Sequence, residues 1–235
     1  QGINGSGHSA DSLMDNRPGG RDSNFRVGEM SQDGVSGEVL FPTLGLRLYS
    51  LEDARLQEAC FRAYNDWLIE YCSVAPDRLY GIATIAVYDT DIAIEEMRRC
   101  RNAGMVGAMV WQVPHEDLPF TSDHYEPFWA AAQDLNMPLS LHILTARSGT
   151  GANPASGKDF LLSLANLHHQ IERSISVLVY GGVLEKFPGL RIVSAENDVG
   201  WMAYFMYRLD TVQHRLGALG NMKLPLRASE YIKRQ

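Results

Sequence analysis

The sequence predicts an α/β fold with a parallel sheet, arranged like part of a (β/α)8 TIM barrel. Five apolar runs of strand length alternate with longer segments of helical periodicity. This alternation favours parallel pairing, because each helical crossover returns the chain to the same end of the sheet. A complete barrel has eight strands in roughly 250 residues. We therefore expect an incomplete barrel of about five strands in these 235 residues.

An open, doubly wound sheet is the alternative architecture. Its dinucleotide-binding version has a Gly-x-Gly-x-x-Gly turn after a strand, and no predicted strand here is followed by one. Residues 79–87 and 106–113 are apolar nearly throughout, which is typical of strands covered on both faces. The barrel is the preferred prediction.

The elements are predicted in chain order. Residues 1–28 are rich in Gly, Ser, Asn and Asp without periodicity, so we expect a flexible leader there and the partial barrel domain over 29–235. Ser50 is the predicted N-cap of the first long helix, and Gly104 follows the end of the second. Strands are predicted at 37–42, 79–87, 106–113, 138–144 and 190–196, and helices at 51–73, 89–103, 124–136, 158–187 and 199–216.

Composition and charge argue against several classes of protein. The net charge is −7 and no stripe of Lys and Arg is present, so neither nucleic acid nor an acidic membrane surface is an expected partner. The longest apolar runs are far shorter than the ~18 residues of a membrane span. We expect a cytoplasmic protein, because no signal peptide is visible and the three cysteines are odd in number and lie in helical segments.

Two polar residues come at the ends of apolar strands. His142 lies near the end of the run 138–144, and Glu196 closes the run 190–196. The carboxyl ends of barrel strands form one mouth where the chemistry takes place, so we expect these two side chains to face each other across a pocket. The sequence therefore predicts an enzyme. The structural alternatives are a buried strand-end histidine and a glutamate that bonds to the next loop.

The chain resembles the amidohydrolase-related (amidohydrolase 2) family, whose best-known member is aminocarboxymuconate-semialdehyde decarboxylase. The resemblance covers roughly residues 30–235, and the set of blocks in this order carries it. The blocks are DGV at 33–35, EVLFPT at 38–43, AYNDW at 63–67, APDRL at 75–79, YEPFWA at 125–130, GGVLEKFPGL at 181–190 and SAENDVGW at 194–201.

The resemblance implies a metal-dependent barrel. In the family, a His-x-His pair on the first strand, a His on the fifth and an Asp on the eighth bind a divalent ion, commonly zinc. His142 matches the fifth-strand metal ligand. Glu196 stands where the decarboxylase has a catalytic His on the sixth strand, so we expect Glu196 to be the catalytic base or a further ligand. The chain departs from the family pattern because it has no His-x-His pair and no C-terminal strand with the Asp.

This chemistry is coherent, because a bound divalent ion lowers the pKa of its water and a neighbouring carboxylate can take the proton. We expect a non-oxidative decarboxylase of a small carboxylated or aromatic molecule, with a divalent metal, Zn by preference, and homodimers as in relatives. The alternatives are a metal-dependent hydrolase of a C–N or C–O bond and a non-catalytic barrel that has lost its metal. The missing His-x-His pair supports the last.

Four further residues are candidates for lining the substrate site: Trp111, Asn197, Asp198 and Trp201. Trp111 ends a strand and Trp201 follows Glu196 closely, so both could form an aromatic wall, although packing is the commoner use of tryptophan. Asn197 and Asp198 have the alternative of capping the helix predicted from about residue 199.

Overall fold

The computed structural model describes residues 18–147, 158–221 and 223–235. Within these residues it contains one five-stranded sheet in the order β1-β2-β3-β4-β5, and every neighbouring pair is parallel. The parallel pairing and the strand order predicted from the sequence are confirmed. The strands are β1 (Glu38–Leu40), β2 (Leu79–Thr84), β3 (Gly107–Val110), β4 (Leu139–His142) and β5 (Ile192–Ala195).

The sheet is curved as in a barrel. Phe41, directly after β1, has its ring centroid 5.3 Å from that of His142 at the end of β4. In a flat sheet these two strands would lie three spacings apart, or about 14 Å at ~4.8 Å per strand. The curvature therefore brings the carboxyl ends of β1 and β4 together on the concave side.

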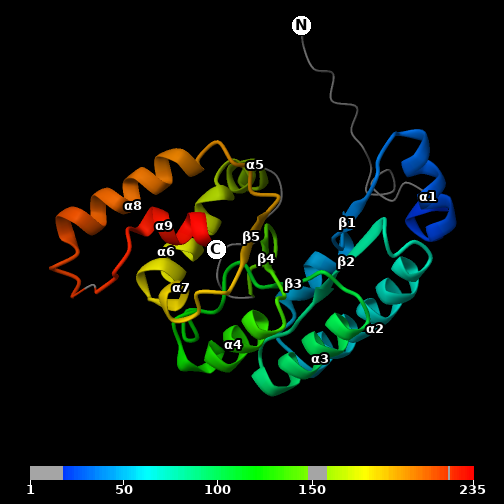
Figure 1. The fold of residues 1–235 in the computed structure, drawn as a ribbon, viewed down its shortest axis with the longest axis horizontal. Helices are drawn as coiled ribbons and strands as arrows, with labels where there is room; N and C mark the ends of the chain where they lie inside the picture. Colours follow the sequence, from blue (N-terminus) through cyan, green and yellow to red (C-terminus); the bar gives the residue numbers. More distant parts are fainter. Residues whose placement is uncertain (1–17, 148–157, 222) are drawn as a thin grey trace, which may run out of the picture.

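Helices connect the strands and cover the sheet (Figure 1). One group lies beside β2 and β3, and a second group, mainly yellow to red in the figure, lies beside β4 and β5. The first group is α2 (Ala54–Ser73), α3 (Thr90–Asn102) and α4 (Glu126–Asp134). The second is α5 (Lys158–Ala165), α6 (His168–Tyr180), α7 (Val183–Lys186), α8 (Met202–Leu216) and α9 (Ala228–Arg234). The short 3-10 helices in the described residues are η1 (Pro18–Gly20), η2 (Leu44–Ser50) and η3 (Asp123–Tyr125).

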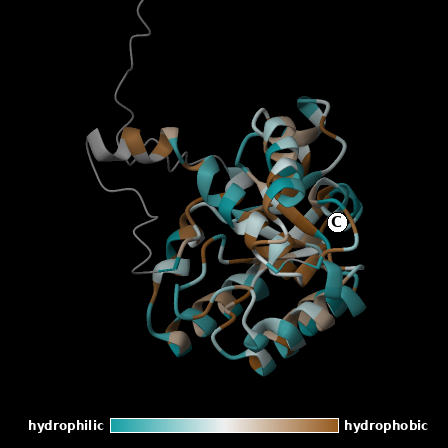
Figure 2. Cartoon of the chain, turned by 90° about the vertical axis from the view of Figure 1, so that its left-hand side faces the viewer, coloured by the Kyte–Doolittle hydropathy of each residue, from teal (hydrophilic) through white to brown (hydrophobic). Residues whose placement is uncertain are grey.

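The hydrophobic core lies between the strands and the inner faces of these helices. β3 and β4 are buried along their whole length, as expected for strands with near-continuous apolar sequence. Figure 2 shows hydrophobic residues concentrated at the centre of the folded molecule and many hydrophilic residues on the outer helices. No helix in the described ranges is both long and apolar enough to cross a membrane.

The structure differs from the sequence prediction at the proposed leader. Residues 1–17 lie outside the described residues, but helix α1 (Ser23–Gln32) occupies part of the predicted leader. Asp22 caps it by accepting a hydrogen bond from the Asn24 backbone N–H at 2.9 Å. Met30 is buried against Tyr71, which anchors the helix to α2. The polar composition concealed a helix that is held by its cap, by the burial of Met30 and by polar contacts such as the Arg26–Glu38 ion pair.

The first long helix also starts later than predicted. Ser50 is the last residue of η2, and α2 begins at Ala54. Asp53 is the N-cap, because its carboxylate accepts a hydrogen bond from the Leu56 backbone N–H at 3.1 Å. Both residue types are good N-caps, so the sequence alone did not separate them.

Candidate functional site

His142 and Glu196 lie together at the carboxyl edge of the sheet. His142 is the last residue of β4 and is 4% exposed, and Glu196 follows β5 directly. The β4–β5 ladder pairs His142 with Ala195, so the register places the two side chains next to each other. Nε2 of His142 is 3.3 Å from Oε2 of Glu196. The two side chains are therefore neighbours at one edge of the sheet as predicted, but they are in direct contact and do not face each other across a pocket.

The hydrogen bonds of His142 define which ring nitrogen faces the site. Nδ1 lies 2.8 Å from the carbonyl oxygen of Ile143. A carbonyl only accepts, so Nδ1 carries a proton and donates it. In a neutral ring Nε2 then has a lone pair directed at the Glu196 carboxylate. Two acceptors at 3.3 Å attract each other only when a proton or a cation lies between them. The pair is thus a site for a proton or a metal ion.

The backbone around this pair is strained. Leu144, Glu196 and Asp198 have φ values of 64°, 56° and 56°, in the left-handed region that residues other than glycine rarely adopt. Such residues cost about 1–3 kcal/mol each and persist only where surrounding contacts impose the conformation. The concentration of strain at the ends of β4 and β5 marks this edge as a candidate functional region.

The other predicted site residues have different environments. Trp111 is fully buried and donates its indole N–H to the Tyr49 carbonyl at 3.0 Å, so it packs in the core and does not line an open site. Asp198 is exposed. Trp201 is half-buried and donates its indole N–H to the Asn197 carbonyl at 2.7 Å. Helix α8 begins only at Met202 and has no side-chain cap, so neither Asn197 nor Asp198 caps it.

Sequence reasoning missed a cation at the same edge. The guanidinium carbon of Arg147 lies 4.6 Å from the ring centroid of Tyr88 and 5.7 Å from that of Trp111. These residues come after β4, β2 and β3 respectively, so they share the carboxyl edge. Burial raises the pKa of Tyr88, and Arg147 opposes part of this rise. Their common position at or just after the carboxyl ends of three predicted strands was the available signal, but Arg147 alone forms no motif.

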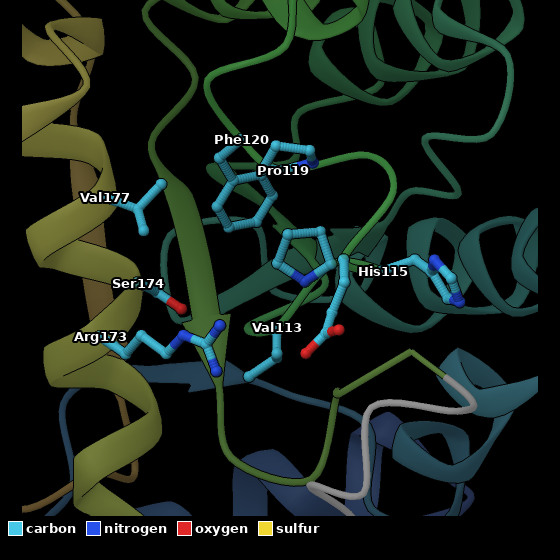
Figure 3. Close-up of a pocket in the computed structure, with 9 residues that line it drawn as sticks. Val113, His115, Pro119, Phe120, Arg173, Ser174 and Val177 are labelled. Carbon is cyan, nitrogen blue, oxygen red and sulfur yellow. The ribbon is translucent and has the colours of Figure 1, made fainter.

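A separate pocket lies between α6 and the loop after β3. Figure 3 shows Arg173 and Ser174 extending from α6 toward it, with Pro119 and Phe120 on another side and His115 pointing away. Its volume is about 350 Å³, near the lower limit for small-molecule sites. Neither His142 nor Glu196 lines it. Because it lacks the strand-end residues, the pocket is distinct from the His142–Glu196 pair.

The described residues fit only part of a metal site. Nε2 of His142 and the carboxylate of Glu196 are nitrogen and oxygen donors of the kind that divalent ions accept. A catalytic zinc ion usually has three protein ligands. Within the described ranges, no group of three or more His, Cys, Asp and Glu side chains is arranged to hold a metal ion. This pair alone is therefore not a complete metal centre.

The parallel half-barrel, with a histidine and a glutamate at the carboxyl ends of its strands, is the arrangement of a barrel enzyme. Comparison with known families gives a family of this kind. The family model described as Amidohydrolase matches residues 15–231. The chain belongs to the amidohydrolase family, which confirms the resemblance seen in the sequence.

Several of the relatives and solved structures that it resembles are decarboxylases. The chain is 32% identical to gamma-resorcylate decarboxylase of Rhodococcus jostii (strain RHA1) over 167 residues, covering 63% of this chain and 48% of the relative. It resembles the structure of 5-carboxyvanillate decarboxylase from Sphingomonas paucimobilis with a TM-score of 0.70 and 22% identity, covering 93% of this chain and 66% of the other. A dihydroxybenzoic acid decarboxylase from Polaromonas sp. JS666, solved with bound manganese and the inhibitor 2-nitroresorcinol, has a TM-score of 0.70 at 22% identity, covering 89% and 64%.

The two structural likenesses establish the fold, an amidohydrolase-type barrel sheet. The chain spans about half the length of the curated relatives it matches.

Proposed function

We propose that the protein is a metal-dependent, non-oxidative decarboxylase that acts in the cytoplasm on a small aromatic carboxylic acid. The observation that carries the proposal is the 3.3 Å separation between Nε2 of His142 and Oε2 of Glu196 at the carboxyl edge of the sheet. The names of the relatives, gamma-resorcylate decarboxylase among them, support this reaction and this class of substrate.

The two residues have different proposed roles. His142 is a metal ligand, because its Nδ1–H is engaged by the Ile143 carbonyl and leaves Nε2 available. Glu196 moves a proton, because its side chain is 66% exposed and can exchange protons with solvent. Decarboxylation breaks the bond from the ring carbon to the carboxylate, releases CO2 and leaves an electron pair on that carbon. A proton delivered by Glu196 then forms the new C–H bond.

A divalent ion at His142 would polarise the carboxylate or a water molecule. Manganese is the first ion to test, because the Polaromonas structure contains it. Zinc, the ion expected from the sequence, is the second. Trp201 and Asp198 are proposed to border the substrate, whereas Asn197, predicted from the sequence to do so, is buried. A homodimer remains a prediction from the sequence.

Two other functions have specific support. A hydrolase would use the same Glu196 carboxylate to take a proton from water. A non-catalytic barrel is favoured by the lack of a three-ligand group among the described residues. The decarboxylase is preferred because the relatives reported above catalyse that reaction by name.

The test is a substrate panel on the full-length gene product loaded with Mn²⁺ or Zn²⁺. Dihydroxybenzoates, methoxybenzoates and matched benzoate esters and anilides are incubated with the protein, and the products are separated by chromatography while CO2 is trapped. We expect CO2 and the corresponding decarboxylated aromatic compound from one or more free acids, and no cleavage of esters or anilides. Ester or anilide cleavage without CO2 would show a hydrolase. A metal-loaded protein inert toward the whole panel would favour the non-catalytic barrel.

A further inference from the structure

Asn197 connects the backbone segments that carry His142 and Glu196. Its side-chain Nδ2 donates to the Leu141 carbonyl at 3.2 Å and to the Ala195 carbonyl at 2.8 Å. These are the residues directly before His142 and Glu196. One amide group therefore joins the ends of β4 and β5 at the point where both chemical side chains leave the sheet.

The main chain of Asn197 is held as well. Its carbonyl accepts the indole N–H of Trp201 at 2.7 Å, which ties it to the start of α8. Glu196 and Asp198, the residues on either side, both have left-handed backbone conformations. A turn with two such residues needs outside contacts to keep its shape. Asn197 supplies them from a side chain that is 4% exposed.

We infer that Asn197 is a positioning residue that sets the separation between His142 Nε2 and Glu196 Oε2. The inference rests on the proposed function where it concerns turnover, but the geometry of the pair and its affinity for a metal ion are independent of the substrate. The side-chain Oδ1 is buried and has no hydrogen-bond partner among the described residues. The contacts of this side chain therefore come from its NH2 group, the part that asparagine has and aspartate lacks.

Asn197→Asp tests the inference with almost no change of shape. The substitution places a carboxylate oxygen against the carbonyls of Leu141 and Ala195, so the bridge becomes repulsive. Asn197→Ala removes the bridge without repulsion and serves if the aspartate variant does not fold. Asn136→Asp is the matched control, because Asn136 also has a positive φ of 47° but is exposed just after α4, before the amino end of β4, whereas His142 lies at the carboxyl end of that strand.

The measurements are a crystal structure of each full-length variant, Mn²⁺ affinity by titration calorimetry, and kcat and KM separately. We expect Asn197→Asp to widen the His142–Glu196 separation and to weaken Mn²⁺ binding about 10–100-fold, the usual effect of losing a residue that orients a ligand. In an active enzyme kcat falls by a similar factor with little change in KM. Asn197→Ala follows in the same direction, and Asn136→Asp matches the wild type.

Two outcomes overturn the inference. One is a variant of Asn197 whose crystal structure retains the 3.3 Å separation together with wild-type Mn²⁺ affinity. The other is an Asn136→Asp variant that loses affinity to the same extent. A wild-type protein that binds Mn²⁺ but decarboxylates nothing would refute the proposed function alone, because the structure and affinity measurements would still decide the role of Asn197.

Discussion

Replacing Glu196 by glutamine separates a catalytic role from a structural one. Glutamine keeps the size of the side chain and removes its charge and its capacity to hold a transferable proton. The Glu196 side chain is 66% exposed, so solvent screens its interaction with His142. Exposed ion pairs contribute about 0–1 kcal/mol, and the unfolding free energy of the variant should therefore differ from that of the wild type by less than about 1 kcal/mol.

The expected effect on turnover is much larger. Loss of a positioned proton donor or acceptor slows a reaction by about 10²–10⁴-fold, equivalent to about 3–5 kcal/mol of activation free energy at 1.36 kcal/mol per decade. The assay measures loss of the aromatic acid and release of CO2 by the metal-loaded full-length gene product, with metal content and urea unfolding measured on the same samples. Glu95→Gln, an equivalent change at an exposed position of α3, is the control and should leave turnover unchanged.

A Glu196→Gln variant with full turnover would refute the reasoning, because Glu196 would then be structural. A variant that loses both stability and bound metal would also refute it. The Glu196 carboxylate would then stabilise the folded state, although its exposure predicts almost no effect on the unfolding free energy.

Two predictions concern the scaffold that carries the site. Asn65→Ala removes buried hydrogen bonds to the Thr84 backbone N–H at 2.8 Å and carbonyl at 3.0 Å. It should lower the unfolding free energy by about 2–6 kcal/mol, since each of the two unpaired groups costs ~1–3 kcal/mol. Urea unfolding monitored by circular dichroism measures this, and an effect no larger than that of the exposed Asn102→Ala would contradict it. Burial acts to raise the pKa of Glu96, but hydrogen bonds led by that from Arg99 outweigh it, and the pKa lies below its usual value. A lowered pKa stabilises the fold above the unfolded-state pKa of about 4.3 and loses this contribution as the pH falls through the folded-state value. The stability difference between wild type and Glu96→Gln should therefore shrink on acidification in that range, and a constant or growing difference would contradict the assignment.

Much of the sheet could be predicted because its information is local. Residues 79–87 and 106–113 are apolar nearly throughout, and such runs between helical segments are typical of parallel strands covered on both faces. The proximity of His142 and Glu196 followed from the same reasoning, because parallel strands place their carboxyl ends at one edge. Helix α1 was missed because the Gly- and Ser-rich composition of the predicted leader outweighed a local N-cap signal at Asp22, and because its burial of Met30 depends on contacts made after folding.

The rest of the candidate site depends on contacts between residues far apart in the chain. Asn197 reaches the Leu141 carbonyl across 56 residues, and nothing in the local sequence distinguishes this from a helix cap. Arg147 is enclosed by Tyr88 and Trp111 through the arrangement of three loops. Trp111 follows a strand, yet its indole turns into the core to meet the Tyr49 carbonyl. Strand ends are predictable from the sequence, whereas the direction of a side chain at a strand end is not.

The most direct test of the central claim is the removal of the His142 imidazole in the full-length gene product. Wild type and His142→Ala are loaded with Mn²⁺ and freed of excess ion, and bound metal and CO2 released from 2,6-dihydroxybenzoate and related hydroxybenzoates are quantified on the same samples. The proposal that His142 is a metal ligand of a decarboxylase predicts that wild type retains metal and releases CO2, and that His142→Ala loses both. A His142→Ala protein that retains its metal and releases CO2 at the wild-type rate would contradict it.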